Sequence, residues 1–166
     1  MNTLMKRRST RKYLDQQVEI EKIETILRAA MQSPTAYDAQ GWDFIVVTSE
    51  DKRREIAQMS PWSAFAVEAP VHIVACTDLD RAYPGPALWP GDMGAVCQTM
   101  LLQAEDEGLG AWLGVWPHED RCQLLRGILD IPESVVPYAV ITVGYKREEK
   151  PYVDRFDPTK IHWERY

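Results

Sequence analysis

The sequence predicts an α+β fold in which helices flank a small mixed β-sheet, and three observations lead to this expectation. Short apolar runs of strand length alternate irregularly with segments of helical periodicity. These runs are too few for a doubly wound sheet, in which strands and helices alternate regularly. The chain has 166 residues, of which 45% are hydrophobic and 27% are charged, and this is enough for one ordinary core. We therefore expect a single domain over residues 1–166.

The first half of the chain contains two predicted helices and two predicted strands. Apolar residues recur at three- and four-residue steps over 20–31, which predicts an amphipathic helix that stops at the Ser-Pro pair of 33–34. A β-branched run at 44–48 predicts a strand. A serine followed by two acids predicts a second helix over about 49–59. The apolar run 71–76 predicts the second strand.

A long helix is predicted near the middle of the chain. The segment before it, 78–91, is rich in proline and glycine and predicts an irregular surface loop. Asp92 is expected to cap the helix, and the glycines of 108–110 are expected to end it. Its predicted apolar face consists of Met93, Val96, Cys97, Met100, Leu101 and Ala104.

The remaining elements are shorter. The apolar run 111–115 predicts a strand, and Pro117 is expected to open a fourth helix that extends to about Leu129. The run 138–143 predicts the last strand. The tail over 146–166 is charged and has no strong period, so we assign no regular structure to it.

The cysteines and histidines indicate neither a disulfide framework nor a metal site. The three cysteines are an odd number with no C-x-x-C pair, and the three histidines are scattered. These residues are Cys76, Cys97, Cys122, His72, His118 and His162. No apolar stretch approaches the roughly 20 residues that cross a bilayer, and the N-terminus lacks the apolar core of a signal peptide. We expect a soluble, cytoplasmic protein with no metal and no membrane partner.

Positive charge is concentrated at the N-terminus. Residues 1–13 contain five Lys and Arg residues and no acid, whereas the rest of the chain carries 14 Lys and Arg against 25 Asp and Glu. Arg7, Arg8, Ser9 and Arg11 place three guanidiniums and a hydroxyl within five positions, and guanidinium forks bind phosphate through two-point hydrogen bonds. A solvated basic face or a nucleic-acid patch is the alternative. The acidic remainder would repel a polyanion, so we expect a small anion and no nucleic acid.

A second group of residues, SPTAYDAQGW at 33–42, lies between the first predicted helix and the first predicted strand. Together with the arginine-rich segment, it resembles the nitroreductase family of flavoproteins, in which an arginine-serine-arginine segment precedes a helix that ends in a serine-proline turn. The resemblance continues in GLGAWLG at 108–114, in Gly144-Tyr145 and in Arg155 of the tail. It spans nearly the whole chain.

The resemblance implies a nitroreductase-like fold with a central long helix. It also implies an FMN bound at the interface of a homodimer, with the C-terminal tail of each subunit exchanged with its partner. Arg7 and Ser9 would then bind the phosphate and ribityl chain, joined by Arg155 from the tail, and Arg8 is a further cofactor-binding candidate. Arg11 would face the pyrimidine edge of the flavin, where a fixed cation stabilises the negative charge of the reduced ring.

A second set of implied flavin contacts lies in the turn after the first helix. The backbone groups that would face the ring from the partner subunit belong to Pro34, Thr35 and Ala36. Gln40 would form a hydrogen bond near the flavin. Asp38 and Gly41 depart from the family pattern, which has asparagine and proline at these positions, so the contact of Asp38 with the cofactor stays open.

The remaining implied contacts lie at residues 113–114, in the loop over 78–91 and at three tryptophans. Leu113 and Gly114 would lie against the reactive edge of the ring. The loop rich in proline and glycine is expected to decide substrate choice. Aromatic side chains could sandwich a flat substrate over the flavin, and the candidates are Trp62, Trp89 and Trp112.

The implied activity is a two-step exchange. NADH or NADPH would bind transiently, pass a hydride to FMN and leave, and a nitroaromatic, quinone or similar flat electron-poor substrate would then be reduced in the same pocket. No side chain is identified as an obligate acid or base. The alternatives are a specialised reaction of the same superfamily, such as reductive dehalogenation or dehydrogenation, and a non-catalytic module that binds an anion or a flavin.

Overall fold

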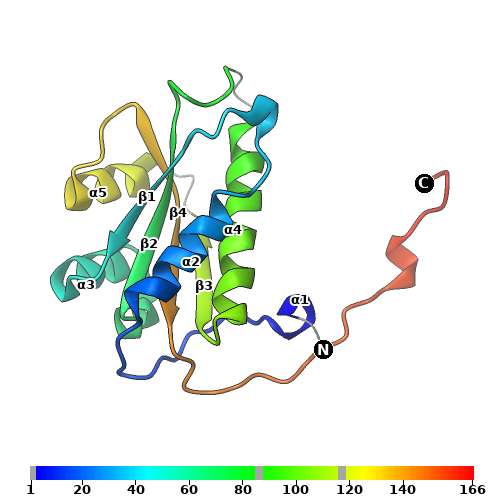
Figure 1. The fold of residues 1–166 in the computed structure, drawn as a ribbon, viewed down its shortest axis with the longest axis horizontal. Helices are drawn as coiled ribbons and strands as arrows, with labels where there is room; N and C mark the ends of the chain where they lie inside the picture. Colours follow the sequence, from blue (N-terminus) through cyan, green and yellow to red (C-terminus); the bar gives the residue numbers. More distant parts are fainter. Residues whose placement is uncertain (1–2, 85–87, 116–118) are drawn as a thin grey trace.

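The computed structural model describes residues 3–84, 88–115 and 119–166 (Figure 1). Its centre is a four-stranded sheet with the spatial order β1-β2-β4-β3. The strands are β1 (Trp42–Val47), β2 (Val71–Asp78), β3 (Gly110–Val115) and β4 (Val135–Gly144). All three neighbouring pairs are antiparallel, so the prediction of a mixed sheet is wrong. Among the described residues there are also two isolated bridges, a parallel one between Ser9 and Ala111 and an antiparallel one between Tyr13 and Lys146.

The antiparallel direction follows from how the connections return the chain. Between β1 and β2 the chain forms helix α3 (Glu50–Gln58) and the 3-10 helix η2 (Pro61–Glu68), which pack against each other. Strand β2 therefore starts beside the end of β1, with His72 opposite Val47. A parallel pair would need a crossover that carries the chain back to the opposite end of the first strand.

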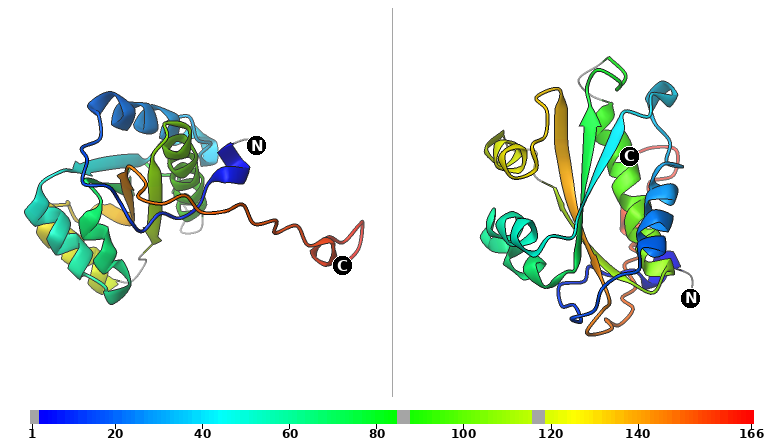
Figure 2. Two further views of the ribbon diagram at one scale, coloured as in Figure 1. Left: turned by 90° about the horizontal axis from the view of Figure 1, so that it is seen from below. Right: turned by 60° about the vertical axis from the view of Figure 1, so that its left-hand side comes forward.

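Helices cover both faces of the sheet (Figure 2). α2 (Ile20–Ala30) and α4 (Trp89–Asp106) pack on one face, and α3 and α5 (Glu119–Leu129) pack on the other. The larger core lies under α2 and α4, and the whole predicted apolar face of α4 is buried there. The predicted apolar face of α2 consists of Ile20, Ile23, Leu27, Ala30 and Met31. It is confirmed at Ile23 and Ala30, which are buried, and at Leu27, which packs against the core, whereas Ile20 and Met31 are exposed.

The central helix α4 begins earlier than the sequence predicts. Its first residue is Trp89, and Leu88 occupies the N-cap position without a side-chain hydrogen bond. The prediction that Asp92 caps the helix is therefore wrong. Pro90 lies in the first turn, where its fixed φ is compatible with a helix and its missing N–H costs nothing. The predicted start of the fourth helix at Pro117 lies outside the described residues.

The N-terminal segment crosses one end of the sheet. The Thr10 backbone N–H donates to the Ala111 carbonyl at 3.0 Å, and the Leu14 N–H donates to the Tyr145 carbonyl at 2.9 Å. Between these bonds the Tyr13 side chain is fully buried. A glycine is required where the segment passes, because a Cβ on Gly144 would lie 2.6 Å from Cδ of Pro70 and 2.9 Å from the Tyr13 ring.

The C-terminal tail leaves the body of the molecule after β4 (Figures 1 and 2). At its start it is held by Lys150, whose Nζ donates to the Ser9 carbonyl at 2.7 Å, and by Arg8, whose Nε donates to the Pro151 carbonyl at 3.3 Å. Further along, Phe156 and Trp163 are 73% and 85% exposed. Of the helices in the described ranges, none has the length and apolar character that a membrane span requires.

Candidate functional site

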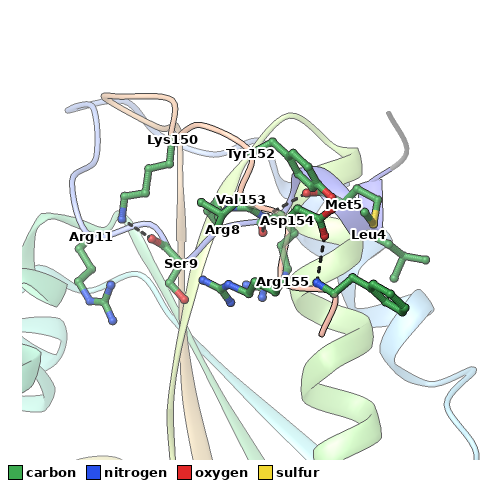
Figure 3. A pocket seen from close by; sticks show the side chains of 12 residues that line it. Leu4, Met5, Arg8, Ser9, Arg11, Lys150, Tyr152, Val153, Asp154 and Arg155 are labelled. Atoms are coloured by element: carbon green, nitrogen blue, oxygen red, sulfur yellow. Dashed lines mark hydrogen bonds between the residues drawn. The ribbon is translucent and has the colours of Figure 1, made fainter. Parts of the chain in front are cut away.

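The two ends of the chain meet in a cavity of about 590 Å³ (Figure 3). One side comes from residues 4–11 and the other from residues 150–156 of the tail. Five residues that the sequence predicts for the cofactor site line this cavity, namely Arg7, Arg8, Ser9, Arg11 and Arg155. The fold therefore brings together side chains from opposite ends of the chain.

The cavity is strongly cationic. Its charged lining consists of four arginines and Lys150 against one carboxylate, Asp154. Within the described chain, the guanidiniums of Arg7 and Arg155 form neither a hydrogen bond nor an ion pair. Unpaired guanidiniums at this density favour binding of an anion, which offsets their mutual repulsion.

Arg8 has a different role from its neighbours. Its Nη1 donates to the carbonyl of Arg7 at 2.7 Å and to the carbonyl of Met5 at 3.1 Å. The guanidinium lies 5.6 Å from the centroid of the Tyr152 ring, which is cation–π geometry. Its Nη2 is buried and has no hydrogen-bond partner among the described residues. Arg8 therefore fixes the local backbone and leaves one donor for a ligand.

Arg11 is exposed and is supported by aromatic side chains. Its guanidinium lies 5.8 Å from the centroid of the Phe65 ring, which belongs to η2. The Phe65 ring packs edge-on against Trp112 of β3, with centroids 5.0 Å apart. The sequence did not predict η2, because a 3-10 helix that starts at Ser60-Pro61 has no amphipathic period.

The turn that contains Pro34, Thr35 and Ala36 lies at the other end of α4. The turn contacts the first turn of α4, where the Ala36 N–H donates to Oδ1 of Asp92 at 3.0 Å. The arginine segment lies near the last residue of α4, Asp106, which accepts a hydrogen bond from the Thr3 hydroxyl at 2.9 Å. Asp92 and Asp106 are separated by about 21 Å along the helix axis. A single chain therefore does not bring the turn into contact with the arginine cavity.

This turn has an unusual backbone. Tyr37, Asp38 and Gln40 have φ values of 54°, 55° and 49°, in the left-handed region that non-glycine residues rarely adopt. The Gln40 side-chain amide donates to Oδ1 of Asp38 at 2.8 Å, and its backbone N–H donates to the Thr35 hydroxyl at 3.1 Å. The Asp38 carboxylate is thus paired within the turn. Strained residues of this kind cluster at functional sites.

Leu113 and Gly114 lie on β3, which is an edge strand. Leu113 packs against the larger core, and Gly114 is buried. The same strand begins beside Ser9 and Thr10, so β3 connects the arginine segment to these two residues.

The candidate aromatic side chains do not gather around one pocket. Trp89 packs edge-on against Tyr138 with centroids 6.0 Å apart, Trp112 contacts Phe65, and Trp62 is 82% exposed. Tyr37 stacks with Tyr83; Tyr83 lies in the loop that was expected to decide substrate choice, whereas Tyr37 was not predicted as an aromatic contact.

The histidine and the cysteines of the sheet and central helix are structural. His72 is fully buried, shares a hydrogen bond through Nε2 with the Ala66 carbonyl at 2.8 Å, and burial lowers its pKa to about 4. Burial raises the thiol pKa of Cys76 and of Cys97 to about 12, so both remain protonated. In the described part of the chain no cluster of His, Cys, Asp and Glu could hold a metal ion. His118 lies outside the described residues.

A sequence profile of the Nitroreductase family matches residues 4–69 and 59–145. The chain belongs to the nitroreductase family. The matched ranges contain the arginine segment, the strained turn and all four strands, so the family assignment covers the body of the fold described above.

Several nitroreductase relatives match the chain over its full length. One from Methanothermobacter thermautotrophicus, named "Putative NADH dehydrogenase/NAD(P)H nitroreductase", is 41% identical over 169 residues, covering 100% of this chain and 87% of the relative. An FMN reductase [NAD(P)H] from Bacillus subtilis is 22% identical, covering 100% of this chain and 74% of its own. The solved structure of an FMN-dependent nitroreductase from Clostridium difficile is 29% identical, with a TM-score of 0.91 and 99% of both chains covered.

Proposed function

We propose that the chain is an FMN-dependent oxidoreductase that uses NADH or NADPH to reduce flat, electron-poor acceptors such as nitroaromatics and quinones. The observation that carries the proposal is the cavity in which unpaired guanidiniums from both ends of the chain meet. Relatives named as NAD(P)H-using or FMN-dependent enzymes support the choice of cofactor and donor.

The cavity is suited to the phosphorylated part of FMN. Arg7, Ser9 and Arg155 bind the phosphate and the ribityl chain in this proposal, and the buried Nη2 of Arg8 gains the partner that it lacks in the described chain. When bound, FMN supplies the hydride exchange between the nicotinamide and the acceptor, while the protein supplies position and electrostatics. Arg11 holds a cation at the pyrimidine edge, and the Phe65 ring keeps its guanidinium in place.

The proposed enzyme is a homodimer that shares its sites. In one chain the turn at Pro34, Thr35 and Ala36 lies at the opposite end of α4 from the arginine cavity, so we assign the ring contacts of this turn to a partner subunit. The exposed Phe156 and Trp163 support an exchange of tails between subunits, because burial of such side chains against a neighbour is favourable.

The experiment compares FMN with riboflavin, which lacks the phosphate. Arg155→Ala is expected to weaken FMN binding by about tenfold to hundredfold, because each hydrogen bond to a charged group contributes about 1.5–3 kcal/mol. Riboflavin binding should not change. Arg54→Ala is the matched control, because Arg54 is a half-exposed arginine that pairs with Glu50 on α3. A wild-type chain that retains no FMN, or an equal effect on both flavins, would contradict the proposal.

Turnover is tested with the FMN-loaded protein. NADH and NADPH are each offered with a quinone, a nitroaromatic and a halogenated phenol. Oxidation of nicotinamide coupled to the first two acceptors is expected, and turnover of the halophenol alone would indicate a specialised dehalogenase instead. Sedimentation is expected to find a flavin-loaded dimer, and a flavin-loaded monomer would refute the shared site.

A further inference from the structure

Two tyrosines, Tyr37 in the turn after α2 and Tyr83 in the segment before α4, stack against each other. The ring centroids of Tyr37 and Tyr83 are 4.1 Å apart and the ring planes differ by 9°. Tyr83 is half-buried, whereas Tyr37 is 79% exposed. One face of Tyr37 is therefore covered by Tyr83, and most of its remaining surface is open to solvent.

The two rings meet because their segments are fixed to one another. A Cβ on Gly41 would lie 2.9 Å from the backbone nitrogen of Ala82, so only glycine permits this approach without a shift. The Asp78 N–H donates to the Gly41 carbonyl at 2.7 Å. Arg81 forms ion pairs with Asp78, at 2.9 Å, and with Asp43 of β1. Gly41 thus allows the segment of Tyr83 to lie against the turn of Tyr37.

The position of Tyr37 is also held by a strained backbone. Left-handed conformations of non-glycine residues cost of order 1–3 kcal/mol each and persist only when the surroundings impose them. Here the surroundings are the hydrogen bonds of Gln40 to Asp38 and Thr35, together with the bond of the Ala36 N–H to Asp92. A strained turn that presents an aromatic ring to solvent contributes little to stability, which points to a binding role.

We infer that the Tyr37–Tyr83 pair is a stacking platform that binds the flat, electron-poor ring of the acceptor substrate. The inference rests on the proposed function, which places the preceding residues of this turn against the FMN ring of the partner subunit. The face of a tyrosine ring is electron-rich, so it attracts electron-poor rings such as nitroaromatics and quinones. The ring of a reduced nicotinamide is electron-rich, so the platform favours the acceptor over the donor.

The test measures binding without turnover. The FMN-loaded protein is titrated, in the absence of any nicotinamide, with nitrobenzene and with nitrocyclohexane, which carries the same nitro group on a ring that is not flat. Tyr37→Ala is expected to raise the Kd of nitrobenzene about two- to tenfold, the loss of one aromatic stack. The Kd of nitrocyclohexane should stay within about twofold, and Tyr37→Phe should retain the wild-type preference.

A second variant removes the stack without changing the strained turn. Tyr83→Leu keeps an apolar side chain beneath Tyr37 and should also weaken nitrobenzene binding, by less than Tyr37→Ala does. In steady state, kcat/KM for the aromatic acceptor should fall in both variants, whereas kcat/KM for the nicotinamide should be maintained, because the two half-reactions are separate in a two-step exchange.

The outcomes separate this inference from the proposed function. A wild-type chain that takes up no FMN refutes the proposed function and with it the placement of the platform. A chain that takes up FMN normally refutes the platform alone if Tyr37→Ala leaves the Kd of nitrobenzene unchanged. An equal loss for nitrobenzene and nitrocyclohexane also refutes the platform, because it would show that stacking is not what Tyr37 contributes.

Discussion

Removal of one hydroxyl from the N-terminal segment should destabilise the whole protein. The Tyr13 hydroxyl donates to the Thr10 carbonyl at 3.0 Å, so the 2.7 Å bond to Thr142 Oγ1 is one in which Thr142 donates. Burial raises the pKa of Tyr13, and the phenol therefore remains protonated and able to donate. Tyr13→Phe leaves both partners buried and unpaired.

The magnitude follows from the two lost bonds. A net contribution of about 1 kcal/mol for each bond gives about 2 kcal/mol of unfolding free energy. For a chain of this length, that corresponds to a Tm lower by about 4–8 °C. Because Tyr13 anchors the segment that carries the arginines, FMN retention should decrease as well.

The assay is urea unfolding of Tyr13→Phe, Thr142→Val and the double variant. We expect a coupling energy of about 1 kcal/mol between the two positions. Tyr145→Phe is the matched control, because the Tyr145 hydroxyl donates to Glu19 at 2.7 Å on the exposed surface and its loss should cost less than about 0.5 kcal/mol. A loss at Tyr13 that does not exceed the loss at Tyr145 would refute the reasoning.

Three further substitutions test other parts of the structure. Arg11→Ala should lower the reduction potential of bound FMN by about 30 mV, the equivalent of one lost charged interaction, as measured by dye-equilibrium titration, and Arg54→Ala should not change it. Gly144→Ala should destabilise by about 1–3 kcal/mol in urea unfolding through overpacking, whereas Gly127→Ala, in α5 with open space around it, should not destabilise. The pKa of His72 is about 4 in the folded protein and about 6.5 in the unfolded chain. As the pH falls below about 6.5, the imidazole is therefore protonated in the unfolded chain before it is protonated in the folded protein, and the free energy of unfolding decreases. Wild type should lose about 2 kcal/mol more than His72→Gln between about pH 7.5 and about pH 5, and parallel pH profiles of urea unfolding would contradict this.

The helices of the larger core could be predicted because their burial pattern is local. The apolar residues of α4 recur at steps of mostly three and four residues, and the same residues are buried in the structure. The direction of the strands could not be predicted in this way. It depends on η2, which returns the chain from α3 to β2 and is set by the Ser60 side chain, the acceptor for the Trp62 N–H, and by Pro61.

The candidate site was predictable in part. The charge of Arg7, Arg8 and Arg11 is visible in the sequence, but their meeting with Arg155 came only from the family resemblance. The structure supplies the physical reason, because the segment is fixed across the end of the sheet and lies beside the start of the tail. Composition and periodicity describe only local sequence, so they do not predict a contact between opposite ends of a chain.

The stacking of Tyr37 with Tyr83 was not predicted, although Tyr83 lies in the loop that was expected to decide substrate choice. The predicted aromatic contacts to a substrate were Trp62, Trp89 and Trp112, yet Trp89 and Trp112 contact aromatic neighbours within the fold. The useful signal was Gly41. A glycine at such a position indicates a close approach of two backbones, and here that approach brings Tyr37 and Tyr83 together.

The cationic cavity and the exposed apolar side chains of the tail are both energetically unfavourable in an isolated chain, and the proposed FMN-loaded dimer would relieve both. The guanidiniums in the cavity repel one another, and the apolar side chains of Phe156 and Trp163 face water. In the proposed dimer the phosphate of FMN offsets the repulsion and the partner covers the tail. Because the turn and the arginine cavity lie at opposite ends of α4, one FMN in this proposed dimer would join groups from two chains. Cofactor binding and subunit association would then stabilise each other by the same free energy, and Arg155, on the tail and in the cavity, takes part in both.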